Sequence, residues 1–268
     1  MNNEKLKVHF TDKYLISPTN PISINVIGAG GTGSQMLSAL ARMNHSLIAL
    51  GHAGLQVSVF DDDTVSKANL GRQLFSQAEL GLNKGVAIVN RLNRFYGTNW
   101  KAIPKRYDKK ITERLPRETR ANITISCVDS VQARFEIAEI LAQSTMGISE
   151  QNKPLYWLDT GNGKFTGQVV LATIGDIAQP RSKRFGTVSK LPFVTEEFKH
   201  LFNQAEQDDD TPSCSLAEAL EKQDLFINST LASVSASLLW QLFREGMIYD
   251  RGFFLNLKGF RMQPLKVA

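Results

Sequence analysis

Cysteine and long hydrophobic runs are both scarce in this sequence of 268 residues. The two cysteines, Cys127 and Cys214, stand far apart and form no CxxC pair, so the sequence predicts neither a disulfide framework nor a zinc site. No apolar run reaches the roughly 18 residues that a membrane-spanning helix needs, and the N-terminus is polar and mixed in charge. We therefore expect a cytoplasmic protein that neither enters a membrane nor binds zinc.

Histidine and runs of basic residues are also in short supply. The four histidines, which show no ligand spacing and no pairing with a cysteine, are His9, His45, His52 and His200. We assign none of them to catalysis or to a metal. The formal net charge is +5, but Lys and Arg are scattered along the chain, which predicts a solvated basic surface. Nucleic acid is therefore not the partner we expect.

Glycine is concentrated in one informative segment, residues 25–36 (NVIGAGGTGSQM). An apolar run at 22–27 predicts a buried parallel strand, and apolar residues at helical spacing follow to about residue 50. Four glycines lie between them: Gly28, Gly30, Gly31 and Gly33. Glycine lets the backbone approach a ligand closely, and the first N–H groups of a helix favour an anion. The loop therefore predicts a nucleotide phosphate site, in which a side chain at Gly30 or Gly31 would obstruct the phosphates; a purely structural turn is the alternative.

Strand-like and helix-like segments alternate through the first half of the chain. After the first strand and helix, the pattern predicts a strand at 55–60, a helix around 86–92, an extended piece near 100–103, a short helix and a strand at 123–128. Such alternation is typical of parallel β-α-β units. We expect an α/β, Rossmann-like fold with a largely parallel central sheet and flanking helices.

The rest of the chain predicts a single domain over residues 21–268, preceded by a polar lead-in at 1–20. A stretch without clear periodicity, at about 175–214, is interpreted as a long crossover loop. A helical pattern covers 215–244, and the sequence FFLNLKGFRMQPL predicts a C-terminal antiparallel hairpin that turns at Lys258 and Gly259.

Charged residues follow the predicted strands where a ligand crevice would open. Asp61 comes directly after the second strand, so its carboxylate could accept hydrogen bonds from ribose hydroxyls, although a turn cap is an alternative. Arg72 and Lys84 could neutralise phosphate oxygens and support charge that develops in phosphoryl or nucleotidyl transfer. Asp129 ends the later strand, and one carboxylate there can hold magnesium while phosphates and water complete the octahedron.

Together these motifs resemble the ThiF, MoeB and HesA superfamily, the E1-type activators of ubiquitin-like proteins. The motifs, in order, are the glycine loop, VFDDDTV, NLGRQLF, Gly81 with Lys84, and CVDS at 127–130. Within the superfamily the chain is most similar to the ThiF-family protein of the bacterial PRTRC cassette, through PSCSLAEALEKQDLFIN and the C-terminal hairpin.

The resemblance implies an E1-like adenylation fold and an enzyme that uses ATP and magnesium. Its substrate would be the C-terminal carboxylate of a small ubiquitin-like or sulfur-carrier protein. The resemblance implies that Asp61 binds the ribose and Asp129 the magnesium. The residues implied to contact phosphates or developing charge are Asn69, Arg72, Gln73 and Lys84. Together with a small-residue helical face around 229–237, the resemblance also implies a homodimer.

Cys214 matches in place the cysteine that some relatives use to accept the activated carboxyl group. A helix start there would favour the thiolate. A packing role is the alternative, because some relatives stop at adenylation. Cys127 sits within a predicted buried strand, where core packing is expected.

The chain departs from the superfamily in three features. It lacks the paired CxxC zinc motifs, it has no arginine in the first 20 residues to reach a neighbour's ATP, and HSLIALGHAG extends the first crossover.

Two other functions stay open. An NAD-binding Rossmann oxidoreductase would use the glycine loop and Asp61, but would leave Arg72, Lys84 and Asp129 unexplained. A catalytically idle nucleotide-binding scaffold would keep the pocket and lack turnover.

Overall fold

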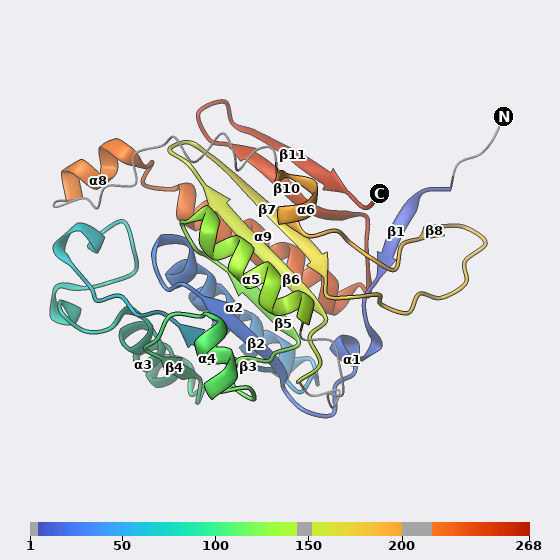
Figure 1. The fold of residues 1–268 in the computed structure, drawn as a ribbon, viewed down its shortest axis with the longest axis horizontal. Helices are drawn as coiled ribbons and strands as arrows, with labels where there is room; N and C mark the ends of the chain where they lie inside the picture. The colour runs from blue at the N-terminus through green and yellow to red at the C-terminus, as the bar shows by residue number, and fades with distance from the viewer. Residues whose placement is uncertain (1–4, 144–151, 200–215) are drawn as a thin grey trace.

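The computed structural model describes residues 5–143, 152–199 and 216–268, and in these ranges an eight-stranded sheet forms the centre (Figure 1). The strand order is β11-β10-β7-β6-β5-β2-β3-β4. The parallel strands are β2 (Ile22–Ile27), β3 (Leu55–Phe60), β4 (Lys101–Ile103), β5 (Ile123–Ser126) and β6 (Tyr156–Asn162). The antiparallel strands are β7 (Thr166–Thr173), β10 (Asp250–Asn256) and β11 (Arg261–Lys266). The predicted α/β fold class, with its C-terminal hairpin, is confirmed.

Helices cover both faces of this sheet. On one face lie α2 (Gly31–Ala49), α3 (Lys84–Tyr96) and α9 (Ile227–Arg244). On the other lie α4 (Lys109–Arg114), α5 (Val131–Gln143) and α6 (Val194–Glu197). Local sequence sets the ends of α3: the Asn83 side chain accepts a hydrogen bond from the Val86 N–H, and Gly97 ends the helix in the left-handed conformation with φ of 68°.

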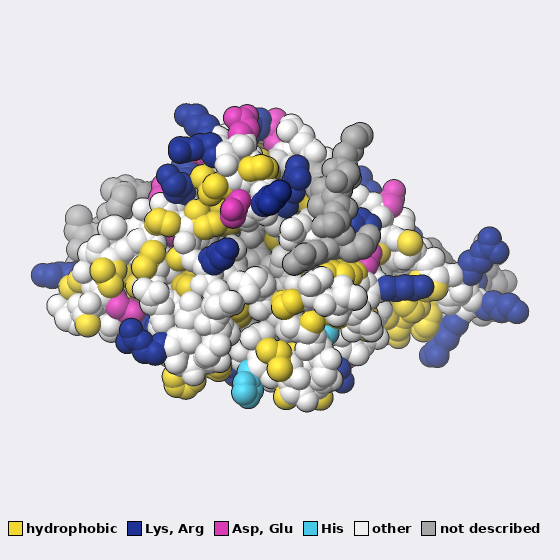
Figure 2. All heavy atoms as spheres, turned by 90° about the horizontal axis from the view of Figure 1, so that it is seen from below, with side chains coloured by type: hydrophobic (Ala, Val, Ile, Leu, Met, Phe, Trp, Pro, Cys, Tyr) yellow, Lys and Arg dark blue, Asp and Glu magenta, His cyan; other side chains and the backbone are white. Residues whose placement is uncertain are grey.

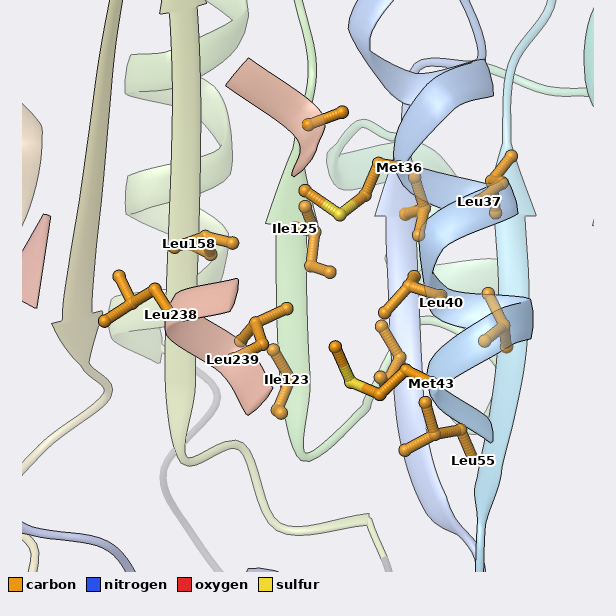
Figure 3. Close-up of a cluster of buried hydrophobic side chains, with 14 of the residues drawn as sticks. Met36, Leu37, Leu40, Met43, Leu55, Ile123, Ile125, Leu158, Leu238 and Leu239 are labelled. Carbon is orange, nitrogen blue, oxygen red and sulfur yellow. The ribbon is translucent and has the colours of Figure 1, made fainter. Parts of the chain in front are cut away.

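The main core lies between the sheet and the pair α2 and α9, as Figure 3 shows. Leu40 from α2 and Leu239 from α9 are fully buried and belong to the same core cluster as Ile123 and Ile125 of β5. Burying one such leucine contributes about 1.5–3 kcal/mol relative to leaving it exposed. This packing fixes the start of α2 against the sheet, where the glycine loop lies.

The helical pattern predicted continuously over 215–244 is wrong at one point, because the structure divides it into α8 (Leu216–Lys222) and α9. The backbone N–H of Asp224 donates to the Lys164 carbonyl in the turn between β6 and β7, 2.9 Å away, so it is unavailable to a continuing helix. The Asp224 side chain then accepts from the Phe226 N–H at 2.9 Å. A tertiary contact therefore breaks the helix at Gln223.

The described part of the first 20 residues contains β1 (Lys7–Phe10) and α1 (Lys13–Ile16). Strand β1 pairs with β8 (Gly186–Thr187) and β9 (Met247–Ile248), beside the main sheet. Val8 and Leu15 are fully buried. His9 is buried too, and its two ring nitrogens lie 2.7 Å from the Val188 carbonyl and 2.9 Å from the Tyr156 hydroxyl.

The surface and the helices add two general observations. On the face seen in Figure 2, Lys and Arg side chains are spread among other side chains and do not form one continuous band. Among the helices in the described ranges, none combines the length and the apolar character that crossing a bilayer requires.

Candidate nucleotide-binding site

A cavity of about 410 Å³ opens at the carboxyl ends of the parallel strands. The chain continues from β2 to β3 and β4 on one side, while β5 and β6 lie on the other, so strand order reverses between β2 and β5. Ligands of open α/β sheets bind at such a reversal. The volume is within the range of small-molecule sites, roughly 300–1,000 Å³. The predicted site residues that line the cavity are Gly28, Gly30, Gly31, Asp61, Arg72, Gln73, Lys84 and Asp129.

The glycines of the loop have different structural roles. Gly28 has φ of +89°, and a Cβ there would lie 2.7 Å from the Cys127 carbonyl oxygen. A Cβ at Gly33 would lie 1.9 Å from the Gly28 carbonyl oxygen, so Gly33 allows α2 to pack closely on the loop and does not itself line the cavity. At Gly30 a Cβ would meet open space. Gly30 therefore leaves room beside the first N–H groups of α2, where an anion is favoured.

Asp61 holds the glycine loop against the end of β3. One carboxylate oxygen accepts from the Ala29 N–H at 2.6 Å, and the other accepts from the Asp63 N–H at 2.9 Å. Burial raises the pKa of Asp61, while these backbone bonds and Lys84 act in the opposite direction. Each oxygen keeps acceptor capacity for a further donor. The contact of Asp61 with a ribose remains a prediction.

The two predicted phosphate-binding cations have different partners. The Lys84 Nζ lies 2.8 Å from a carboxylate oxygen of Asp63, whose side chain is 68% exposed. The Arg72 Nη1 donates to the Gln223 side-chain oxygen at 2.5 Å, and the buried Nε has no hydrogen-bond partner within the described chain. Burial lowers the pKa of Arg72. No carboxylate of the described residues forms an ion pair with Arg72, so its charge is available to an anion.

Gln73 and Asn69, from the same motif, are placed differently. Gln73 lines the cavity, and its side-chain oxygen is buried without a hydrogen-bond partner among the described residues. Asn69 ends the short 3-10 helix η1 (Lys67–Asn69), and its side-chain oxygen accepts from the backbone N–H of Ser66 at 2.8 Å. The structure therefore does not bring Asn69 into the cavity; its side chain caps η1.

Asp129 lies in the loop between β5 and α5, at the edge of the cavity. Arg134 braces this loop by donating to the Val128 carbonyl at 2.7 Å and the Thr160 carbonyl at 3.0 Å. The buried carboxylate of Asp159 pairs with Arg134 at 3.1 Å and accepts from Ser126 at 2.5 Å. Sequence reasoning did not single out Arg134 or Asp159.

The chemistry of the site suits magnesium held by one protein carboxylate. Within the described ranges, no three His, Cys, Asp or Glu side chains gather as a metal site. Magnesium bound by Asp129 together with phosphate oxygens and water, the usual arrangement for this ion, remains a prediction.

Of the two cysteines, only Cys127 lies within the described residues. Burial raises the pKa of the Cys127 thiol to about 12, so little thiolate forms near neutral pH. Cys127 packs against the main core, which confirms its predicted packing role. Cys214 lies outside the described residues.

The polar residues of the cavity wall that the sequence reasoning missed include Thr32, Asn162, Gln223 and Asn228. Thr32 lies inside the glycine motif, which is the one signal that could have found it. Gln223 and Asn228 fall in an uninterrupted helical pattern, and Asn162 ends a buried strand. Nothing in the local sequence indicates that their side chains meet.

The strand reversal, the glycine loop at the start of α2 and an Arg72 without a carboxylate partner in the described ranges are typical of a Rossmann-like nucleotide-binding fold. Residues 16–267 match the ThiF family, and the chain belongs to this family. This match confirms the E1-like superfamily that the motifs predicted.

Relatives agree with the family and the fold. Ubiquitin-like modifier-activating enzyme 5 of Aedes aegypti is 28% identical over 127 residues, which are 43% of this chain and 30% of that protein. The chain thus spans about a third of this curated relative. The crystal structure of PaaA has a TM-score of 0.61 at 13% identity, covering 92% of this chain and 73% of PaaA. E. coli MccB, crystallised with MccA, has a TM-score of 0.60 at 14% identity, covering 95% of this chain and 65% of MccB.

Proposed function

We propose that this chain is an ATP-dependent adenylating enzyme that activates the C-terminal carboxylate of a small ubiquitin-like or sulfur-carrier protein. The observation that carries the proposal is Arg72, a half-buried cation without a carboxylate partner among the described residues, in one cavity with Asp129 and the start of α2. Family membership supports it. Structures of MccB with ATP and with MccA also support ATP and a peptide or small protein as the two substrates.

The mechanism follows from the charges in the cavity. A carboxylate and ATP repel each other, so their charges must be screened before they can react. Arg72, Lys84 and the N–H groups of α2 bind the phosphates. The carboxylate oxygen then forms a bond to the α-phosphorus, and the bond from that phosphorus to the leaving pyrophosphate breaks. Magnesium, held by Asp129, would supply further positive charge to the phosphates.

A second step on Cys214 belongs to the proposal. The thiolate of Cys214 would attack the carbonyl carbon of the acyl-adenylate, so that a thioester forms and AMP leaves. The Cys127 thiol, with its raised pKa, is a poor alternative nucleophile. Mass spectrometry after incubation with ATP and partner should show the adduct in the wild type and lose it in Cys214→Ala, while adenylation continues.

Pyrophosphate exchange into ATP tests the first step. Exchange should require the partner, and Asp129→Ala should abolish it while the protein stays folded. Asp176→Ala, a matched carboxylate in the loop after β7, should keep full exchange. Exchange without any partner, or unchanged exchange in Asp129→Ala, contradicts the proposal. Titration with NADH in parallel with ATP separates it from an oxidoreductase.

The finer assignments are also proposals. We take the small proteins encoded with a PRTRC cassette as first candidates for the partner, and failure with all of them would reject that subfamily assignment.

We also propose a cytoplasmic homodimer. The face of α9 that carries Ala232 and Ser235 packs inward, whereas Ser233 is exposed and free for such a contact. Sedimentation that shows only monomer at micromolar concentration would contradict the dimer.

A further inference from the structure

Four polar side chains form a continuous hydrogen-bonded chain from Arg72 to the glycine loop. We call Thr32, Asn162, Gln223 and Asn228 the amide relay. The Gln223 side-chain oxygen accepts from Arg72 at 2.5 Å and from the Asn228 amide at 2.9 Å. The Asn228 side-chain oxygen accepts from the Thr32 hydroxyl at 2.9 Å and from the Asn162 amide at 2.7 Å. The relay therefore joins the loop after η1 to the starts of α2 and α9 and the end of β6.

Convergent donors fix the orientation of each amide in the relay. Two N–H groups point at the Gln223 oxygen, so this oxygen, and not the amide nitrogen, must face Arg72. Asn228 is only 2% exposed, and its oxygen likewise receives two donors. Asn228 is the buried centre of this network, and a polar network with its bonds made is rigid. The Arg72 guanidinium is thus held at Nη1, and within the described ranges its other N–H groups have no protein partner and can bind a ligand.

The relay also explains why residue 31 is glycine. A Cβ at Gly31 would lie 2.5–2.7 Å from three atoms of the Asn228 side chain: Nδ2, Cγ and Oδ1. The sequence predicted that a side chain at Gly30 or Gly31 would obstruct the triphosphate. The structure gives the two glycines separate reasons: Gly30 borders open space, whereas Gly31 makes room for Asn228.

A neutral partner suits an arginine that must bind phosphate. A carboxylate in place of the Gln223 amide would neutralise the guanidinium and compete with phosphate for its charge. An amide oxygen orients the guanidinium and leaves the charge in place. The contrast with Lys84, which already pairs with Asp63, makes Arg72 the stronger anion site of the two.

We propose that the amide relay is a positioning device: Gln223 and Asn228 orient Arg72 toward the β- and γ-phosphates and so determine the preference for a nucleoside triphosphate over a monophosphate. The inference rests on the proposed function, because it assumes that the nucleotide binds in this cavity. Gln223 and Asn228 are positioning residues that act through Arg72.

Calorimetric titration with ATP and with AMP, both with magnesium, tests the inference. Gln223→Met keeps the length of the side chain but removes the acceptor, so ATP affinity should fall about tenfold while AMP affinity stays within about twofold. Gln223→Glu should weaken ATP further. The exposed Glu221→Ala, two residues earlier, is the control and should bind both nucleotides normally. Equal losses for ATP and AMP in Gln223→Met, or no loss, would overturn the inference.

A second measurement tests the relay without nucleotide. Gly31→Ala should lower the midpoint of thermal unfolding in the wild type, because Asn228 must move. The same substitution should cost little in Asn228→Ala, which lacks all three atoms that the new Cβ would meet. Strictly additive effects of the two substitutions would overturn the relay. Normal ATP binding without any partner-dependent exchange would instead reject the proposed function alone, so the two failures are distinguishable.

Discussion

Two arginines of this protein, the buried Arg134 and the half-buried Arg72, have opposite kinds of partner. Arg134 pairs with the buried carboxylate of Asp159 and donates to the carbonyls around it. Arg72 lines the cavity; among the described residues its partner is one amide oxygen, that of Gln223, and its buried Nε has no partner. A charge compensated by a buried carboxylate supports structure, whereas a charge oriented by a neutral amide remains able to bind an anion. The difference separates a structural arginine from a ligand-binding one.

Removing the compensated arginine should have the largest effect on stability. Arg134→Met leaves the Asp159 carboxylate buried without its cation, which typically costs about 3–5 kcal/mol. Denaturant unfolding should show this loss. Lys109→Met, which removes an exposed pair with Glu139 at 2.8 Å, is the control and should stay within about 0.5 kcal/mol of the wild type. Equal, small effects of both substitutions would remove the distinction between the two arginines.

Removing Arg72, the arginine without a carboxylate partner among the described residues, should affect activity strongly and stability only slightly. Arg72→Met removes a half-buried charge without a carboxylate partner among the described residues, so unfolding stability should change by less than about 1 kcal/mol. Pyrophosphate exchange should fall about 100-fold or more, as when a charge-stabilising donor is removed from a transition state. A large loss of stability with nearly normal exchange would show that Arg72 is structural.

The open space beside Gly30 gives a third test, of whether phosphates bind next to Arg72. Gly30→Val would project into the cavity, where phosphates oriented by Arg72 need room, so ATP affinity should fall about tenfold, or about 1.4 kcal/mol. Its thermal midpoint should stay close to that of the wild type. Gly259→Ala, in the β10 to β11 turn, should bind ATP normally and serves as the control. Unchanged ATP affinity in Gly30→Val would show that the loop is only a turn.

The buried side chain of His9 offers a further contrast, because its surroundings disfavour the charged form. Burial lowers the pKa of His9 from its ordinary value of 6.5, although Val188 and Asp12 act in the opposite direction. The unfolded chain therefore binds the proton more tightly, and stability that is complete above pH 6.5 should decrease as the pH falls through the lower folded pKa. Unfolding measured from pH 5 to 8 should show this decrease in the wild type and in the exposed control His45→Gln. His9→Gln should lack this component, and an unchanged profile there would exclude His9 as the cause.

Local sequence was sufficient for much of the fold and part of the site. Apolar runs identified β2, β3 and β5, because strands buried on both faces are nearly continuous in hydrophobic residues. The glycine spacing located the start of α2, and Asp61 and Asp129 were found because they follow strands. Asp61 comes directly after β3, whereas Asp129 lies in the loop after β5, which ends at Ser126 and is thus shorter than the predicted strand at 123–128. Asn69 was assigned to the site from its motif, yet its side chain caps η1, since short polar side chains serve local turns as readily as ligands.

The sequence by itself determined the ThiF family, the parallel sheet and the loop that can receive phosphate, because these depend on periodicity and on glycine at fixed spacing. Only the tertiary structure decided which residues hold Arg72 and why residue 31 is glycine. Gln223, Asn228 and Thr32 are separated by up to 196 residues in sequence, and a contact with the β6 to β7 turn breaks the helix that would have carried Gln223 elsewhere. Hydrogen bonds between distant segments leave no local pattern, since their spacing is set by the packing of helices on the sheet.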